Sequence, residues 1–554
     1  MTSFPNLSIY TDLKLFILKY KMPIVGAFLQ WYFTNLLQVD RLFFTYDSEN
    51  EVFYLIKLLY LLWLIFVWCG CRGIYFQYKN GNARIKRGFS IFIIYLLISA
   101  VFLIILWPGT WAWDDIWTLL SERKYYLYAW QHILTSIYQM LFLQMLPFPG
   151  GIVLQQVLVE GVCVAYIVER LEYCVLDKYW GNKNTKTTII KLLPFFLPPV
   201  ISYQYSGYRL GLYVFLEATL LTLLITSAYE KEKWSNFKLG VSVLLTAILA
   251  NWRTESVLYF PLLIFFLYRQ KKEVLPLLKK CCAYFGVTIL FFGIFSYQKH
   301  ELKNSNYEII SSLRPLAEIL KVVDRQKYKE ELQKIDKVIK VDVAYANPKL
   351  NGERLYWDKK IVRVKYTKKQ YNGYIKAFFR LIKEYPKVVA WERWNLLKVS
   401  SGFAGEMPNN TFGAATLFYN TKVNSMNDRS KDAFQKAAFI CSKPVLNKAR
   451  EKFIRLLGCV DSKYHAKGIF KVIWNHLIPL GFILVTYVIF VLKKKWMIVT
   501  VLSVLLLKFF IVTLTQPSGW FMYYLSFYLI GYIILVQGVF YLFYKYKAKE
   551  NLQG

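Results

Sequence analysis

Acidic residues and histidine are scarce in this sequence of 554 residues. It has 35 Asp and Glu against 70 Lys and Arg, and only 4 His. No group of Cys and His has the spacing of a zinc site, and no nucleic-acid-binding motif accompanies the net charge of +35. The sequence therefore excludes a zinc module and favours basic loops that face anionic lipid over a nucleic-acid partner.

Cysteine is too sparse for a disulfide framework. Most of the eight cysteines, such as Cys69, Cys163 and Cys282, lie in or beside apolar stretches, where Cys behaves as a small hydrophobe. Cys441 and Cys459 lie in a polar region and could pair if that region is extracytoplasmic. One pair without a framework favours free thiols. The N-terminus lacks the apolar core and cleavage site of a cleavable signal peptide.

Long apolar runs, in contrast, are abundant in a chain that is 56% hydrophobic. The stretches from Phe89 to Trp107 and from Trp520 to Phe543 contain no charged residue. A helix needs roughly 20 such residues to cross the bilayer with its backbone groups bonded internally. The sequence therefore predicts an all-α polytopic membrane protein of about 12 transmembrane helices. The predicted spans are 23–40, 52–70, 89–107, 151–168, 188–204, 210–228, 239–252, 255–268, 280–297, 467–492, 496–514 and 520–543.

Lys and Arg divide the loops between these spans into two sets. Twelve spans place the basic clusters in 71–88, in 269–280, at 493–495 and after the last span on one side, which the positive-inside rule makes cytoplasmic. We therefore expect a multi-pass protein of the cell membrane with both termini in the cytoplasm. The expected parts are a transmembrane module 1–297 with an outer loop 108–150, a mostly helical extracytoplasmic domain 298–466, and C-terminal transmembrane helices 467–554.

The outer loop carries the most informative residues. A Pro-Gly turn after Trp107 is followed by adjacent carboxylates, Asp114 and Asp115, among tryptophans that include Trp113, and then by His132. Carboxylates partly buried by tryptophan should not both ionise easily, so one pKa should rise, as a general base requires. The alternative is a solvated helix start beside interfacial tryptophans.

Arginines on the same predicted side could bind phosphate. Arg253 and Glu255 lie where a short hairpin turns at head-group level, and Arg209 is a weaker candidate on the same face. An arginine can hold a phosphate through two hydrogen bonds and stabilise it as a leaving group. The alternative is an Arg–Glu pair that only stabilises the hairpin.

The stretch from Trp107 to Trp117, WPGTWAWDDIW, resembles the first outer loop of the GT-C membrane glycosyltransferases. The resemblance is greatest to a bacterial branch in which a Pro-Gly turn precedes an aromatic residue and an Asp, with a His further on. It implies a GT-C-like fold, a donor sugar linked to polyprenyl phosphate, and Asp114 as the catalytic base or an acceptor ligand. His132 matches the family His, and Arg253 with Glu255 matches an Arg and acid at the hairpin.

The sequence departs from this family pattern in two places. Asp115 stands where a small hydroxyl residue is usual. Met522-Tyr523-Tyr524 stands where relatives commonly carry Arg-Tyr, which increases the need for a phosphate-binding arginine elsewhere. If a divalent cation such as Mg or Mn takes part, Asp114, Asp115 and His132 are the candidate ligands.

The predicted function is an inverting glycosyltransferase. It would move a sugar from a polyprenyl-phosphate donor to an extracytoplasmic glycan or wall-polymer acceptor, with Asp114 and Asp115 as catalytic residues. Arg253 and Arg209 would bind the donor phosphate, while His132, Glu255 and Trp113 would line the acceptor site. Two alternatives are a polysaccharide polymerase or ligase that relies on arginines, and a flippase or transporter of lipid-linked glycans. The absence of internal repeats argues against the transporter.

Overall fold

The computed structural model is helical throughout the part of the chain that it describes, where three isolated bridges stand in place of a sheet. The predicted all-α class is therefore confirmed for these residues. They are 6–45, 50–111, 113–176, 185–230, 234–270, 275–303, 305–347, 349–403, 444–462 and 465–553.

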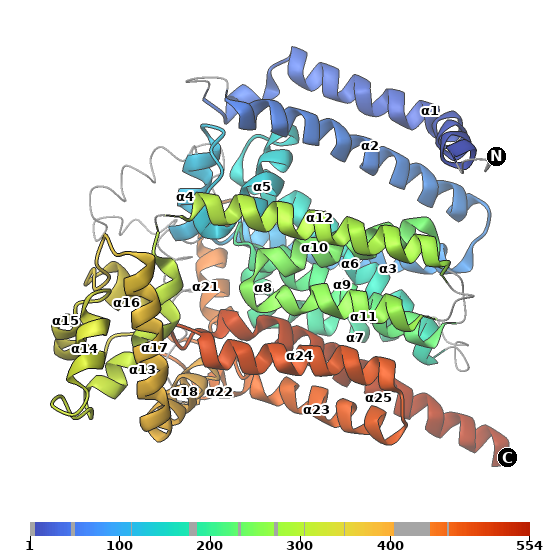
Figure 1. Ribbon diagram of the computed structural model, residues 1–554. Coiled ribbons are helices and arrows are strands. Elements are labelled where there is room, and N and C mark those ends of the chain that lie inside the picture. Colours follow the sequence, from blue (N-terminus) through green and yellow to red (C-terminus); the bar gives the residue numbers. More distant parts are fainter. Residues whose placement is uncertain are drawn as a thin grey trace, which may run out of the picture.

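Within these residues, 8 helices are long and apolar enough to cross a membrane. Their length and composition are those of a membrane protein, and Figure 1 shows them side by side in one bundle. They are α2 (Glu51–Lys79), α3 (Ala83–Leu106), α6 (Pro149–Leu176), α9 (Leu210–Tyr229), α12 (Leu277–Glu301), α22 with α23 (Phe470–Ile473 and Leu477–Leu492), α24 (Trp496–Thr515) and α25 (Leu525–Gln553).

The other four predicted spans are not among these eight helices, so twelve spans stay a prediction. The predicted span 23–40 overlaps α1 (Asn6–Leu36), and the predicted hairpin forms the short helices α10 (Asn236–Trp252) and α11 (Tyr259–Arg269). The stretch 188–204, expected as one helix, is broken into α7 (Thr185–Leu192), a 3-10 turn (Leu193–Phe196) and α8 (Pro198–Gln204). Pro194 and Pro198 stand at these breaks because proline lacks an N–H and clashes with the preceding helical turn.

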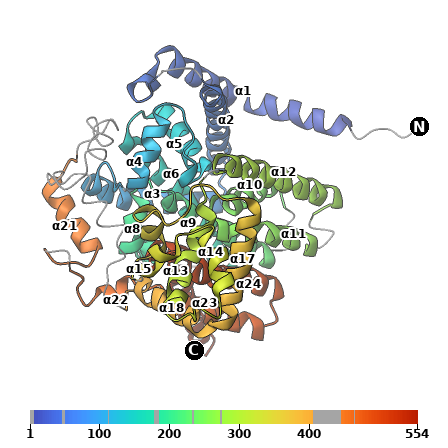
Figure 2. The ribbon, with the colours of Figure 1, turned by 60° about the vertical axis from the view of Figure 1, so that its left-hand side comes forward.

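Two segments outside the eight candidate spans lie at one end of the bundle. The loop 108–150 forms α4 (Trp113–Glu122) and α5 (Ile133–Met145). Helix α25 ends at the far end of the bundle in Figure 1, whereas the described helices of the segment 298–466, called the helical insert below, lie at the front and left of the bundle in Figure 2. Its helices are α13 (Ile310–Leu320), α14 (Lys329–Asp336), α15 (Val341–Ala346), α16 (Gly352–Trp357), α17 (Lys368–Glu384), α18 (Pro386–Ser400) and α21 (Asn447–Leu457).

The helical insert has a core of its own and is also attached to the bundle. Leu316, Leu355 and Leu381 are fully buried in that core. The insert is joined to the turn between α24 and α25 by a hydrogen bond of 3.0 Å from Gly352 N to Pro517 O. Within the described residues no cysteine pairs in a disulfide; Cys459 is buried, and Cys441 lies outside them.

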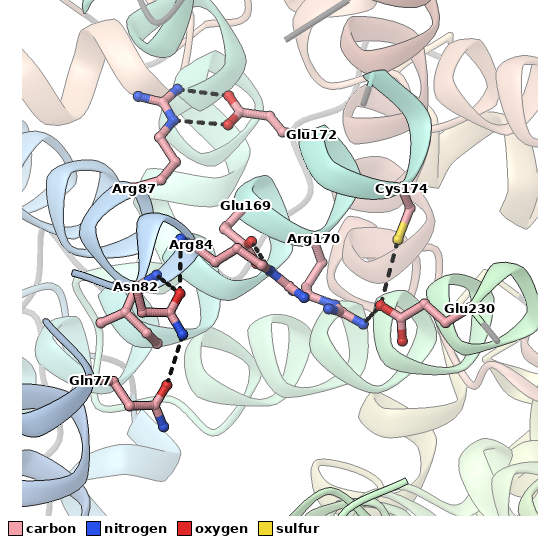
Figure 3. Close-up of polar contacts among 10 residues, drawn as sticks. Gln77, Asn82, Arg84, Arg87, Glu169, Arg170, Glu172, Cys174 and Glu230 are labelled. Carbon is pink, nitrogen blue, oxygen red and sulfur yellow. Dashed lines mark hydrogen bonds and ion pairs between the residues drawn. The ribbon is translucent and has the colours of Figure 1, made fainter. Parts of the chain in front are cut away.

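Ion pairs join the helices at the opposite end of the bundle (Figure 3). Glu172 of α6 binds both Arg87 at 2.7 Å and Lys191 at 2.8 Å. Glu230, just after α9, likewise binds Arg170 and Lys238. These contacts bring together the ends of α3, α6, α7, α9 and α10, which the predicted topology also placed on a common side. The two ends of the bundle are therefore chemically different.

Candidate functional site

The turn that carries Asp114 is held from three directions. Trp111 is buried, and its indole N–H donates to Pro108 O at 3.1 Å. Thr110 N donates to Tyr205 O at 2.6 Å, which fixes the turn to the segment before α9. Arg450 of the helical insert donates to Gly109 O at 2.9 Å. The start of α4 is thus positioned by the bundle and the insert together.

The carboxylate of Asp114 is accessible to solvent and also interacts with neighbouring side chains. It accepts a hydrogen bond of 2.8 Å from Gln131 Nε2. The side chain is exposed, yet the surrounding protein raises the pKa of its carboxyl by desolvation, while the charge of Arg209 acts in the opposite direction. An accessible carboxylate with a raised pKa is what a general base needs.

Asp115 lies in different surroundings. Successive residues of a helix are turned by about 100°, so the two adjacent carboxylates leave α4 on different faces. Asp115 is buried, and its charge acts on Glu122 and Tyr138 inside the bundle as well as on Tyr208. Of the predicted pair, only Asp114 is accessible. The side chain of Trp113 lies outside the described residues.

Arg209 and Arg253 share the surroundings of Tyr208. Burial raises the pKa of Tyr208 to about 12, and the charges that act on this phenol are those of Arg209, Asp114, Arg253 and Asp115. The structure therefore brings the predicted acid and both predicted arginines to one end of the bundle.

The two arginines differ in their partners. Arg253 is buried and forms an ion pair with Glu255, and its guanidinium lies 5.7 Å from the ring centre of Tyr523. Arg209 is half-buried, and within the described chain its buried Nε has no hydrogen-bond partner. A guanidinium with an unsatisfied donor is better prepared to bind an added anion than one already paired with a carboxylate. The predicted order, in which Arg209 is the weaker candidate, stays a prediction.

His132 sits at a strained turn between α4 and α5. Its φ is 72°, a left-handed conformation that is uncommon outside glycine. Its Nδ1 accepts from Leu134 N at 3.2 Å, and Gln298 of α12 brackets the turn by accepting from Ile133 N and donating to Ala129 O. Burial and then the charge of Arg209 lower the pKa of His132 to about 3, so the imidazole is neutral at pH 7.

No group of three or more His, Cys, Asp or Glu that could hold a metal ion occurs in the described part of the chain. The candidate ligands Asp114, Asp115 and His132 therefore do not converge on a metal centre there. The described residues therefore provide no set of ligands for the hypothesised Mg or Mn ion.

Glu353 of the helical insert is a site residue that the sequence did not suggest. Tyr523 Oη donates to its carboxyl at 3.1 Å and Ser518 Oγ at 3.3 Å. Burial, together with the charge of Asp114, raises the pKa of Glu353 to about 8. A second carboxyl thus lies within electrostatic range of Asp114, although no spacing in the sequence connects the two.

Lys508 was also missed because it lies inside the apolar run of α24. It forms an ion pair with Glu217 of α9 and donates to Tyr213 Oη at 2.9 Å. Glu217 is fully buried in the bundle interior. Tyr213 in turn lies 5.9 Å from the guanidinium of Arg253, so this buried pair is part of the support of the candidate site.

Comparison with known proteins identifies no relative: no protein-family model, no curated protein and no solved structure matches the chain. The residues whose charges act on Tyr208 are therefore the basis for a proposed function. They supply the accessible carboxylate of Asp114 and the guanidinium groups of Arg209 and Arg253, and they come from three separate segments of the chain. Glu353 adds a carboxyl within electrostatic range of Asp114.

Proposed function

We propose that the protein is a polytopic membrane glycosyltransferase of the GT-C type. It transfers a sugar from a polyprenyl-phosphate donor to a glycan or wall-polymer acceptor on the extracytoplasmic side of the cell membrane, with both termini in the cytoplasm. The single observation that carries the proposal is that the charges of Asp114, Arg209 and Arg253 all act on the phenol of Tyr208.

The reaction follows from these groups. Asp114 accepts the proton of the acceptor hydroxyl, and the acceptor oxygen forms a bond to the anomeric carbon of the sugar. The bond between that carbon and the phosphate oxygen breaks, and its electron pair leaves with the polyprenyl phosphate. Arg209 and Arg253 stabilise the negative charge on the departing phosphate. Attack from the face opposite the leaving group inverts the anomeric configuration.

The test is transfer activity in membranes that contain the full-length chain. Release of free polyprenyl phosphate from radiolabelled polyprenyl-phosphate hexose is measured for the wild type and for Asp114→Asn. A general base contributes about 10²–10⁴-fold to a rate, so Asp114→Asn is expected to lose activity by that factor. Glu330→Gln, at an exposed carboxylate of α14, is the matched control and should keep the wild-type rate. Unchanged turnover in Asp114→Asn at normal protein level would remove this mechanism.

The same assay separates the alternative of a polymerase or ligase that relies on arginines. That enzyme would lose activity in Arg209→Ala and Arg253→Ala but keep it in Asp114→Asn. A flippase would move the labelled lipid across the membrane without releasing free polyprenyl phosphate in any variant.

A further inference from the structure

An aromatic cluster bridges the 108–150 loop and the helical insert. Trp130, just before α5, meets Tyr307 with ring centres 5.1 Å apart and Trp357 with ring centres 5.0 Å apart, both edge to face. The cluster is not sealed, because Trp130 and Tyr307 are half-buried and Trp357 is 51% exposed. Large aromatic faces therefore remain open beside the candidate site.

Polar groups of the site border this cluster. Glu353 lies four residues before Trp357 on α16, so both leave the helix on the same side. Burial raises the pKa of Tyr307, and the charges of Glu353, Arg209 and Asp114 all act on this phenol. The open aromatic rings thus lie beside Glu353 on α16 and within electrostatic range of Asp114.

We propose that Trp130, Tyr307, Trp357 and Glu353 form a carbohydrate-binding subsite that holds the acceptor glycan beside Asp114. A sugar ring has an apolar C–H face that packs on an aromatic ring, and hydroxyl groups around its edge that need hydrogen-bond partners. Rings with a few polar groups at their border meet both needs. The Glu353 carboxyl and the Tyr307 hydroxyl supply the polar contacts, and Trp357 supplies an accessible face.

The position of the subsite gives it a role in the choice of acceptor. Three of its four residues belong to the helical insert, whereas Asp114 belongs to the loop 108–150. The acceptor would therefore bind the insert and present its hydroxyl to a base from the bundle. As a role in catalysis this rests on the proposed function, but glycan binding itself can be measured without transfer.

The test is isothermal titration calorimetry of the full-length protein in lipid nanodiscs. The probes are cellotetraose, chitotetraose and maltotetraose at millimolar concentration. At least one is expected to bind the wild type, Trp357→Ala is expected to weaken that binding about tenfold or more, and Trp357→Phe is expected to restore most of it. Trp391→Ala, at a tryptophan of α18 that is 63% exposed, is the matched control and should bind as the wild type does. Failure of the wild type to bind any probe, or wild-type binding by Trp357→Ala, would overturn the subsite.

A second comparison separates this inference from the proposed reaction. Glu330→Gln, at an exposed carboxylate of α14 outside the site, should bind the probe as tightly as the wild type. Glycan binding without transfer in any preparation would contradict the reaction and leave the subsite standing. Transfer in which Trp357→Ala leaves the acceptor KM unchanged would contradict the subsite and leave the reaction standing.

Discussion

Lys508 of α24 and Glu217 of α9 form a buried ion pair between two helices that are each apolar enough to span a membrane. A pair of this kind adds little to stability as a whole, but loss of one partner leaves an unpaired buried charge that costs about 3–5 kcal/mol. Lys508→Met should therefore destabilise the protein by that amount. Loss of resistance to denaturation in detergent measures the effect.

The double variant Lys508→Met with Glu217→Leu is the control for this pair. It removes both charges, so it should recover much of the lost stability. If the double variant is as unstable as Lys508→Met with Glu217 kept, the ion pair is not the reason for the loss.

Gly207→Ala should impair the site without touching any of its charged groups. A Cβ at Gly207 would overlap the ring of Trp111, which holds the turn before Asp114. Overpacking of this kind costs about 1–3 kcal/mol and displaces neighbouring groups. We expect transfer to fall at least tenfold at a normal protein level. Gly240→Ala in α10 is the matched control, since its added methyl meets nothing within 4 Å, and equal activity of the two variants would contradict this role of Gly207.

Acid should destabilise the turn at His132. The pKa of His132 is lowered to about 3 in the folded protein, from 6.5, so folding favours the neutral ring. Its contribution to stability is complete above pH 6.5 and is lost as the pH falls toward 3, with a loss of about 2 kcal/mol at pH 5. Thermal unfolding at pH 7 and pH 5 measures it. His132→Asn should reduce the difference in unfolding temperature between pH 7 and pH 5. His300→Asn, at an exposed histidine, is the control. An equal reduction in His300→Asn would show that His132 is not the cause of the difference.

The contribution of Glu353 to folding stability should be lost at high pH, whereas that of His132 is lost at low pH. Its folded pKa of about 8 lies above the usual 4.5, so its contribution to stability is present below pH 4.5 and is lost as the pH rises through 8. Glu353→Gln cannot ionise and should unfold about 2–4 °C above the wild type at pH 9, with a smaller difference at pH 6. Equal unfolding temperatures at pH 9 would show that the carboxyl ionises there without cost. Glu330→Gln provides the exposed control.

The sequence predicts apolar helices well and long-range contacts poorly. An uninterrupted run such as 89–107 has few folded states other than a helix, and α3 confirms it. The prediction of one helix over 188–204 was wrong. The hydropathy of this stretch is continuous, but Pro194 and Pro198 interrupt the helix. Lys508 was missed for a related reason: one charged residue hardly changes the mean hydropathy of a span.

For the candidate site, the sequence identified the members that belong to short motifs. Asp114, Arg209 and Arg253 were recognisable from their local surroundings, whereas Glu353 becomes a site residue only through Tyr523 and Ser518, which lie far away in the chain. The different exposure of Asp114 and Asp115 depends on how α4 packs against the rest of the protein, and the local sequence does not specify this packing.

Helix α9 begins just after Arg209, at the candidate site, and ends just before Glu230, among the ion pairs of the opposite end. Its 20 residues span about 30 Å, the thickness of the hydrocarbon layer. One added residue would lengthen α9 by about 1.5 Å and rotate its two ends by about 100° relative to each other. Arg209 and the distant salt bridges could not then both keep their positions. The number of residues in α9 therefore sets the distance between the candidate site and the ion pairs at the other end of the bundle.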